Sequence, residues 1–287
     1  MKRIHIAWLC GWLLACTIGT VAAEDVRKTA EAGMLVTGSI EVNPDGSFHG
    51  YTLDQPEKLP PVVVSVIGQT LPTWKFDLSN AAAAVVTTRM SLRVVAKPIG
   101  EGNFQVGVQG ATFGGRDAQN GPREDVVHSK QMEQPHYPQA AIAARVSGTA
   151  YLVLRIGRDG TVQEVIAEQV NLDQYGTQPE MKRYRQWLAD ASLDVARHWT
   201  FNVPSRGSQV NDPFWVIRVP VNFSLGTMGT RPAETPYGSW HAYIPGPRET
   251  PPWISKTLAN ESPDALPDGA VGGGDARLRL VTPLSGA

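Results

Sequence analysis

The feature that most constrains the fold is a strictly alternating segment around residue 220. Apolar side chains occupy every second position there, at Trp215, Ile217, Val219, Val221, Phe223 and Leu225. Alternation with a period of two predicts a β-strand that turns one face to a core. Pro220 stands inside this segment, and a proline cannot donate a hydrogen bond to a neighbouring strand. We therefore expect residues 214–224 to form a strand with at least one free edge.

The residues before this strand predict a mixed set of elements. In chain order they are a short Ala-rich helix at 139–145, a hairpin of strands at 150–156 and 161–170, and a helix with apolar residues at 181–195. Asp159-Gly160 lies between the two strands and is typical of a tight turn, because glycine tolerates positive φ. The order helix, hairpin, helix, strand predicts an α+β fold.

This order of elements resembles the C-terminal domain of the TonB family of energy transducers. The residues that carry the resemblance are Tyr137, Pro138, Gly148, Asp159, Gly160, Trp199 and Phe201, followed by the alternating strand. The resemblance covers residues 134–225. It implies a three-stranded antiparallel sheet with two helices on one face.

A degenerate second copy of this pattern precedes it at residues 34–115, and a linker at 116–133 joins the two. The parallels pair Val36-Thr37-Gly38-Ser39 with Val146-Ser147-Gly148-Thr149, Asp45-Gly46 with Asp159-Gly160, and Trp74-Lys75-Phe76 with Trp199-Thr200-Phe201. The β-branched run at 62–67 favours a strand, whereas Pro61 suits a first helical position. We expect a short helix there.

The first 23 residues have the pattern of a signal peptide. Lys2 and Arg3 precede an apolar stretch, and Val21-Ala22-Ala23 offers small residues for cleavage. Two alternatives stay open: a lipid on Cys16, or retention of the segment as a membrane anchor. In each case we expect the rest of the chain in the periplasm, or on the periplasmic face of a membrane, of a Gram-negative cell.

The last segment, residues 226–287, differs sharply in composition. It contains nine Pro and nine Gly among 62 positions and no sustained apolar periodicity. Such a segment buries too little apolar surface to offset its ordering entropy, so we expect a disordered tail. Its aromatic residues, Trp240, Tyr243 and Trp253, are either docking elements or loose packing on the last strand.

Composition and motifs exclude several function classes. Charged residues make up 18% of the chain, the net charge is −1, and no basic run supplies a nucleic-acid site. No two of the six histidines stand four residues apart, and no phosphate loop, dinucleotide fingerprint or catalytic elbow occurs. We therefore expect no metal, no cofactor and no enzymatic activity. The third hypothesis is an enzyme on an unrecognised scaffold.

The resemblance implies a periplasmic protein that grips an extended segment of an outer-membrane transporter, or of another envelope protein, by strand addition. The implied partner-binding positions are Phe214, Val216, Arg218, Pro220, Asn222 and Ser224. An open edge also permits a homodimer. Transducers carry a long Pro-rich spacer after their membrane helix, and here only about ten residues separate the leader from the first expected strand. The alternative is a lipid-anchored structural or cell-wall-binding protein without a transport role.

Overall fold

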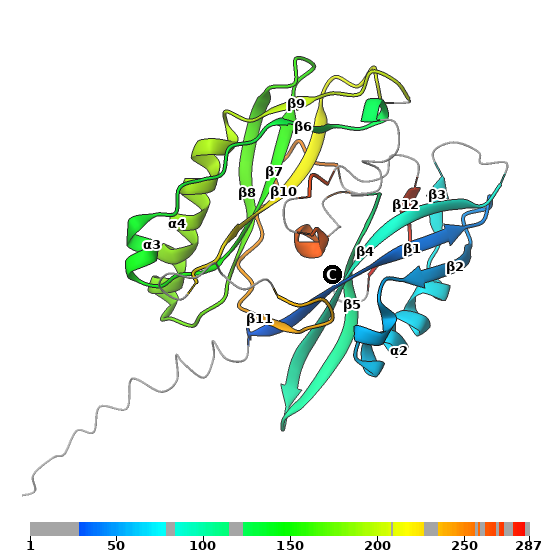
Figure 1. Ribbon diagram of the computed structural model, residues 1–287, viewed down its shortest axis with the longest axis horizontal. Helices are drawn as coiled ribbons and strands as arrows, with labels where there is room; N and C mark the ends of the chain where they lie inside the picture. The colour runs from blue at the N-terminus through cyan, green and yellow to red at the C-terminus, as the bar shows by residue number, and fades with distance from the viewer. Residues whose placement is uncertain are drawn as a thin grey trace, which may run out of the picture.

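The computed structural model describes residues 29–78, 84–114, 123–207, 209–226, 235–255, 258, 262–267, 270–272 and 278–284. Helices and strands are mixed throughout these residues, which confirms the expected α+β class. Two sheet-based units lie side by side, and parts of the C-terminal segment lie between them (Figure 1). The expected signal peptide at 1–23, including Cys16, lies outside the described residues.

The first unit contains an antiparallel sheet in the order β2-β1-β4-β5. Its elements are β1 (Glu31–Val42), β2 (Phe48–Leu53), η1 (Pro56–Lys58), α2 (Pro61–Thr70), η2 (Leu71–Thr73), β3 (Phe76–Leu78), β4 (Val86–Gly100) and β5 (Asn103–Phe113). The β-branched run at 62–67 belongs to helix α2, as Pro61 in the first turn suggested. Val63 and Ile67, one turn apart, are fully buried, so packing of this face outweighs the strand preference of the run.

The core of the first unit is centred on an aromatic cluster. The ring of Trp74 lies 6.0 Å from Phe113 and 6.2 Å from Phe76, and both pairs meet edge to face. Only 2% of Trp74 is exposed. Edge-to-face contact suits the charge distribution of aromatic rings, so these contacts stabilise the unit beyond simple burial.

The second unit contains a three-stranded antiparallel sheet in the order β10-β7-β8. Its elements are η3 (Arg123–Asp125), β6 (His128–Gln131), α3 (Gln139–Ala143), β7 (Gly148–Ile156), β8 (Val162–Leu172), α4 (Gln178–Ala196), β9 (Thr200–Asn202) and β10 (Trp215–Phe223). Helix α4 packs on β7 and β8, and α3 packs on α4 (Figure 1). Strand β6 falls in the expected linker at 116–133 but pairs with β9, so this part of the linker prediction is wrong.

Helix α4 begins at a capping box. Thr177 accepts a hydrogen bond from the backbone N–H of Glu180, and the Glu180 carboxylate accepts one from the backbone N–H of Thr177. Two otherwise unpaired N–H groups are satisfied in this way. Met181 and Leu188 are buried and lie on one face of α4, away from most of its charged residues. The helix therefore packs an apolar stripe against the sheet.

The C-terminal segment differs from the expected disordered tail wherever it is described. Strand β11 (His241–Tyr243) pairs with β1, strand β12 (Leu278–Leu280) pairs with β3, and η4 (Pro263–Ala265) packs on β4 and β5. Apolar side chains in this segment, including Tyr243 and Ile244, are buried. Order here comes from pairing with distant strands, so the high Pro and Gly content did not reveal it.

The short helix η4 connects the two units. The Asp264 carboxylate forms an ion pair with Nε of Arg93 in the first unit at 2.8 Å and accepts a hydrogen bond from Nδ2 of Asn171 in the second at 3.3 Å. Asp264, Arg93 and Asn171 are all buried. Because a buried carboxylate requires such partners, this contact fixes the C-terminal segment between the units. Among the described helices, none combines the length and apolar character needed to cross a membrane.

Candidate functional site

The predicted partner-binding strand lies at one edge of the three-stranded sheet. Strand β10 pairs with β7 without a register shift, from Trp215 opposite Ile156 to Phe223 opposite Gly148. Its alternating apolar residues Trp215, Ile217 and Val219 belong to the core between sheet and helices. The other face and the outer backbone of β10 therefore decide what this edge can bind.

The predicted contact residues differ widely in exposure. Asn222 and Ser224 are exposed, Phe214 and Val216 are half-buried, and Arg218 and Pro220 are buried. The Phe214 ring stacks under the guanidinium of Arg155 at 4.2 Å. The two ends of the strand are therefore more accessible than its middle.

The middle of the β10 edge already has a partner within the chain. The Arg218 N–H donates to the Gly272 carbonyl at 2.6 Å, and the Gly272 N–H donates to the Arg218 carbonyl at 2.9 Å. At Arg218, the free edge that Pro220 predicts is therefore occupied by Gly272. Backbone groups that point away from β7 recur every second residue, so Pro220 is also an outward position. Its lack of an N–H therefore removes no hydrogen bond to β7, which explains why the sheet tolerates it.

The Arg218 side chain lies in a buried ion network that sequence analysis missed. Its Nε and Nη2 atoms donate to the two carboxylate oxygens of Glu168 at 2.7 and 2.9 Å. Arg248 from the C-terminal segment donates to Oε1 of the same carboxylate through Nε at 3.0 Å and Nη2 at 2.6 Å. Glu168 is 0% exposed and Arg218 is 2% exposed. Removing Glu168 would leave Arg218 buried without this counter-charge, so the network is structurally important.

Glu168 occupies a β-bulge, where the register of β7 and β8 shifts between Tyr151 and Leu152. A bulge inserts an extra residue and redirects its side chain. In the sequence, the signal for this buried charge is Glu168 itself, which directly follows the apolar residues Val165, Ile166 and Ala167. No local pattern indicates that its partner is Arg248, which is 80 residues away.

The motif residues near the start of the second unit have structural contacts. The Tyr137 hydroxyl donates to the Val146 carbonyl at 2.5 Å, and its ring meets Phe223 edge to face at 5.3 Å. Burial raises the pKa of the Tyr137 phenol. Pro138 is the N-cap residue of α3. Gly148 lies so close to β8 that an added Cβ would stand 2.2 Å from the Asn171 carbonyl oxygen.

The motif residues of the hairpin turn also hold the backbone of neighbouring segments in place. Backbone and hydroxyl hydrogen bonds from Thr161 lower the pKa of Asp159. Gly160 has φ +79°, and its carbonyl accepts a hydrogen bond from the Phe201 N–H at 2.8 Å. The Trp199 indole N–H donates to the Glu133 carbonyl at 2.9 Å. These residues join the turn, β9 and the segment before α3.

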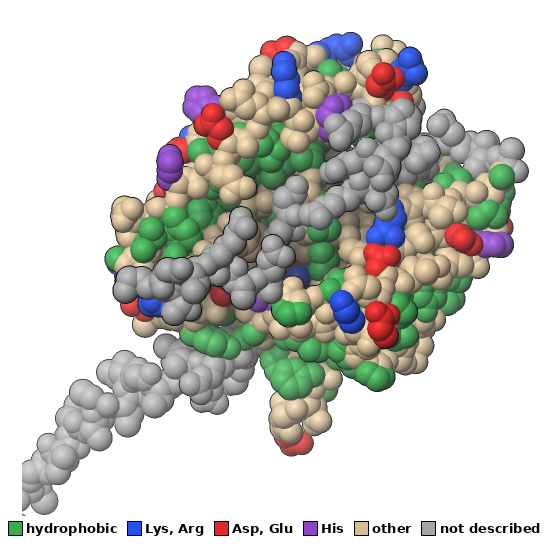
Figure 2. Space-filling view, viewed as in Figure 1, with side chains coloured by type: hydrophobic (Ala, Val, Ile, Leu, Met, Phe, Trp, Pro, Cys, Tyr) green, Lys and Arg blue, Asp and Glu red, His purple; other side chains and the backbone are tan. Residues whose placement is uncertain are grey.

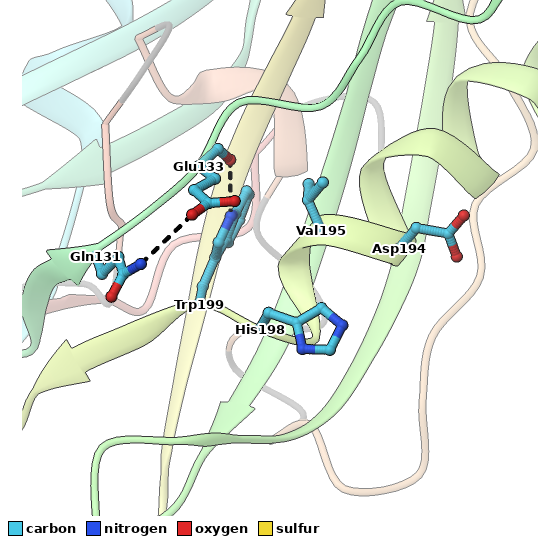
Figure 3. A pocket seen from close by; sticks show the side chains of 6 residues that line it. All are labelled: Gln131, Glu133, Asp194, Val195, His198 and Trp199. Atoms are coloured by element: carbon cyan, nitrogen blue, oxygen red, sulfur yellow. Dashed lines mark hydrogen bonds between the residues drawn. The ribbon is translucent and has the colours of Figure 1, made fainter.

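A small pocket of about 200 Å³ lies beside the end of α4 and is lined by Gln131, Glu133, Asp194, Val195, His198 and Trp199 (Figure 3). Gln131 donates to the Glu133 carboxylate at 3.4 Å, while Asp194 points away from His198. The lining residues therefore form no hydrogen-bonded acid and base pair. In the described part of the chain, no group of three or more His, Cys, Asp or Glu residues is arranged to hold a metal ion.

Fold and site together define an α+β protein whose second unit presents a partly occupied sheet edge. The chain is 34% identical over 99 residues to the protein TonB of Xanthomonas campestris pv. campestris, in strain B100 and in strain ATCC 33913. The match covers 34% of this chain and 38% of each relative, so the chain spans well under half the length of these curated relatives. This similarity supports a TonB-like relationship. No family model matches the chain, and no solved structure matches it.

Proposed function

We propose that the chain is a non-enzymatic, exported TonB-like binding protein whose second unit grips extended peptide segments by strand addition. The partner is a segment of an outer-membrane transporter, and the role is in transport across the outer membrane. The observation that carries this proposal is the 34% identity over 99 residues to TonB. The position of β10 at a sheet edge supports it.

Strand addition requires unpaired backbone groups along the receiving edge. On β10, the outward-facing positions alternate through Val216, Arg218, Pro220 and Asn222. Pro220 has no N–H, and the Arg218 N–H and carbonyl are bonded to Gly272. A peptide that covers the whole edge must therefore displace the chain's own Gly272.

A photoreactive residue at Asn222 tests the proposal directly in envelope fractions, because Asn222 is exposed on β10. We expect it to capture an outer-membrane transporter. The same photoreactive residue at exposed Gln69, on α2 of the first unit, is the matched control and should capture none. Capture of only the protein itself or of cell-wall material at position 222 would overturn the transport role.

The second candidate function is a structural or cell-wall-binding role for a lipid-anchored protein. The C-terminal segment favours it, because residues 241–244 and η4 each contact both units. Mass spectrometry of the mature N-terminus separates the two candidates. A lipid on Cys16 would support the second candidate, whereas an unmodified start at Glu24 would remove its anchor.

A further inference from the structure

The opposite edge of the three-stranded sheet, strand β8, already receives an extended segment of the chain. Leu172 and Ile244 exchange two backbone hydrogen bonds, at 3.1 and 2.7 Å, in an antiparallel bridge. Further along, the Glu249 N–H donates to the Glu168 carbonyl at 2.8 Å. Residues 244–249 thus follow β8 toward its start and leave it at Glu168.

The remaining part of this edge presents backbone groups outward. Since the N–H and carbonyl of Arg218 point away from β7, those of the facing Val153 point toward β8 and meet Ile166. The next residues on either side, Val165 and Ala167, therefore point theirs away from β7. No described residue pairs with this stretch of β8 on its outer side, and it contains no proline.

A groove of about 330 Å³ runs beside this edge. Its walls are β8, helix α4 and the chain's own segment, through Val165, Ala167, Ala189, Leu193, Pro247 and Glu249 among others. The β8 and α4 members of this set are half-buried, and hydrophobic side chains reach the surface over these two elements (Figure 2). A peptide paired with β8 would place every second side chain into this groove.

Two charged residues, Arg185 and Glu249, line the groove, and the guanidinium of Arg185 is already engaged. Arg185 on α4 donates through Nε to the Val170 carbonyl and through Nη2 to the Pro245 carbonyl, both at 3.2 Å. Burial lowers the pKa of Arg185. The guanidinium therefore holds residues 244–249 in place at one end of the groove, and the lining also includes apolar side chains such as Ala167, Ala189 and Leu193.

We propose that the β8–α4 groove is a docking site for an extended peptide in which small apolar residues alternate with polar ones. The peptide adds to β8 at Gln163–Ala167, between Thr161, which Thr200 bridges, and Glu168, where residues 244–249 leave the edge. The proposal rests on the proposed function, peptide binding by strand addition, and adds β8 to β10 as a second receiving edge of the same sheet. Continuity with the chain's own paired segment and the absence of proline favour β8.

Two proline variants separate the two edges. Val165→Pro removes an outward N–H from β8, and Val216→Pro removes one from β10, and neither takes a hydrogen bond from β7. The probe is a fluorescein-labelled octapeptide in which valine alternates with threonine, and its affinity for the full chain is measured by fluorescence anisotropy. We expect Val165→Pro to weaken binding at least about tenfold and Val216→Pro to leave it within about twofold.

The opposite pattern, with loss only in Val216→Pro, would overturn the β8 site and support the proposed β10 edge. Absence of binding to the unmodified chain, or equal binding by both variants, would overturn the β8 site as well. If Val165→Pro does not fold, Leu193→Glu tests the same groove through a half-buried side chain. Amide hydrogen exchange gives an independent measure, because bound peptide should slow exchange at Val165 and Ala167 and not at Val216.

Discussion

The two units of the molecule share one order of elements but finish their sheets differently. Along the chain, the first unit runs β1, β2, α2, β3, β4, and the second runs β7, β8, α4, β9, β10. In both sheets the first of these strands lies in the middle, between the second and the last. In the first unit β5 then pairs along β4, from Met90 opposite Phe113 to Gly100 opposite Asn103. In the second unit the corresponding edge, on β10, bridges to Gly272 within the described residues.

The turns of the two units agree down to single hydrogen bonds. The Phe76 N–H donates to the Gly46 carbonyl at 2.8 Å, and the Phe201 N–H donates to the Gly160 carbonyl at the same distance. Both glycines have φ +79°. The common part of the units is thus the turn and its attachment to the short third strand, while the edges have diverged.

The difference lies at the outer edge of the last shared strand, which a full strand covers on β4 and a single bridge meets on β10. An unpaired edge is a liability that proteins cover or use. The first unit covers the outer edge of β4 with β5 along its length. In the described part of the second unit, single bridges to Gly272 on β10 and to Ile244 on β8, and one from Thr200 to Thr161 beside the start of β8, cover only part of each edge. We infer that the first unit is the scaffold and the second unit is the one suited to a partner.

The largest expected effect contrasts how the C-terminal segment is held on each unit. Glu168→Ala should lower the free energy of unfolding by about 3–5 kcal/mol, because it leaves Arg218 buried without its counter-charge. Asp77→Ala breaks the ion pair with Arg279 on the first unit, whose side chains are 50% and 53% exposed. It should cost about 0–1 kcal/mol. Urea unfolding of both variants measures the difference.

A smaller loss in Glu168→Ala than in Asp77→Ala would contradict this contrast. It would mean that the buried network adds little to the attachment of the C-terminal segment. The double variant adds a check, since the two sites lie in different units and their effects should add within about 0.5 kcal/mol.

The next effect tests whether the two turns are equivalent. An added Cβ would stand 2.0 Å from the Phe76 carbonyl oxygen at Gly46 and 2.1 Å from that of Phe201 at Gly160. Gly46→Ala and Gly160→Ala combine this clash with an unfavourable φ, so each should cost about 2–3 kcal/mol. Thermal unfolding of the two variants measures these losses.

The control for the turns is Gly102→Ala, in the loop between β4 and β5. Gly102 also has a positive φ, +76°, but an added Cβ would meet nothing within 4 Å. Only the backbone strain remains, about 1 kcal/mol. Unequal losses at Gly46 and Gly160, differing by more than the Gly102 effect, would show that the turns serve different purposes.

Local patterns in the sequence predicted the local parts of this structure. The alternation through Trp215 and Phe223, the Asp159-Gly160 turn and the apolar face of α4 each depend on neighbours a few residues away. The C-terminal segment could not be predicted in this way. Its order depends on contacts such as Arg218 with Gly272 and Glu168 with Arg248, which join residues far apart in the chain.

The candidate site shows the same division. The alternating pattern and Pro220 predict the strand and its edge position, but the same pattern places Arg218 among the contacts for a partner. A charged residue on the polar side of an alternating strand is usually exposed, so the pattern favoured that interpretation. Its burial follows from Glu168, which a bulge in β8 directs to it.

The smallest expected effect compares the aspartates of the two turns as the pH falls. Hydrogen bonds from the Ser47 hydroxyl and backbone N–H lower the pKa of Asp45, and those from the Thr161 backbone N–H and hydroxyl lower the pKa of Asp159. A carboxyl whose folded pKa is lowered stabilises the fold above its unfolded value, 3.8. That contribution is lost as the pH falls through the lowered value.

Asp45→Asn and Asp159→Asn should therefore reduce stability slightly at neutral pH and match the unmodified chain at about pH 2. Urea midpoints at both pH values measure this, and because the two turns share one geometry the variants should lose equal amounts. A loss that persists at low pH would mean that the charge is not its cause, and a loss in only one variant would show that the shared geometry does not extend to electrostatics.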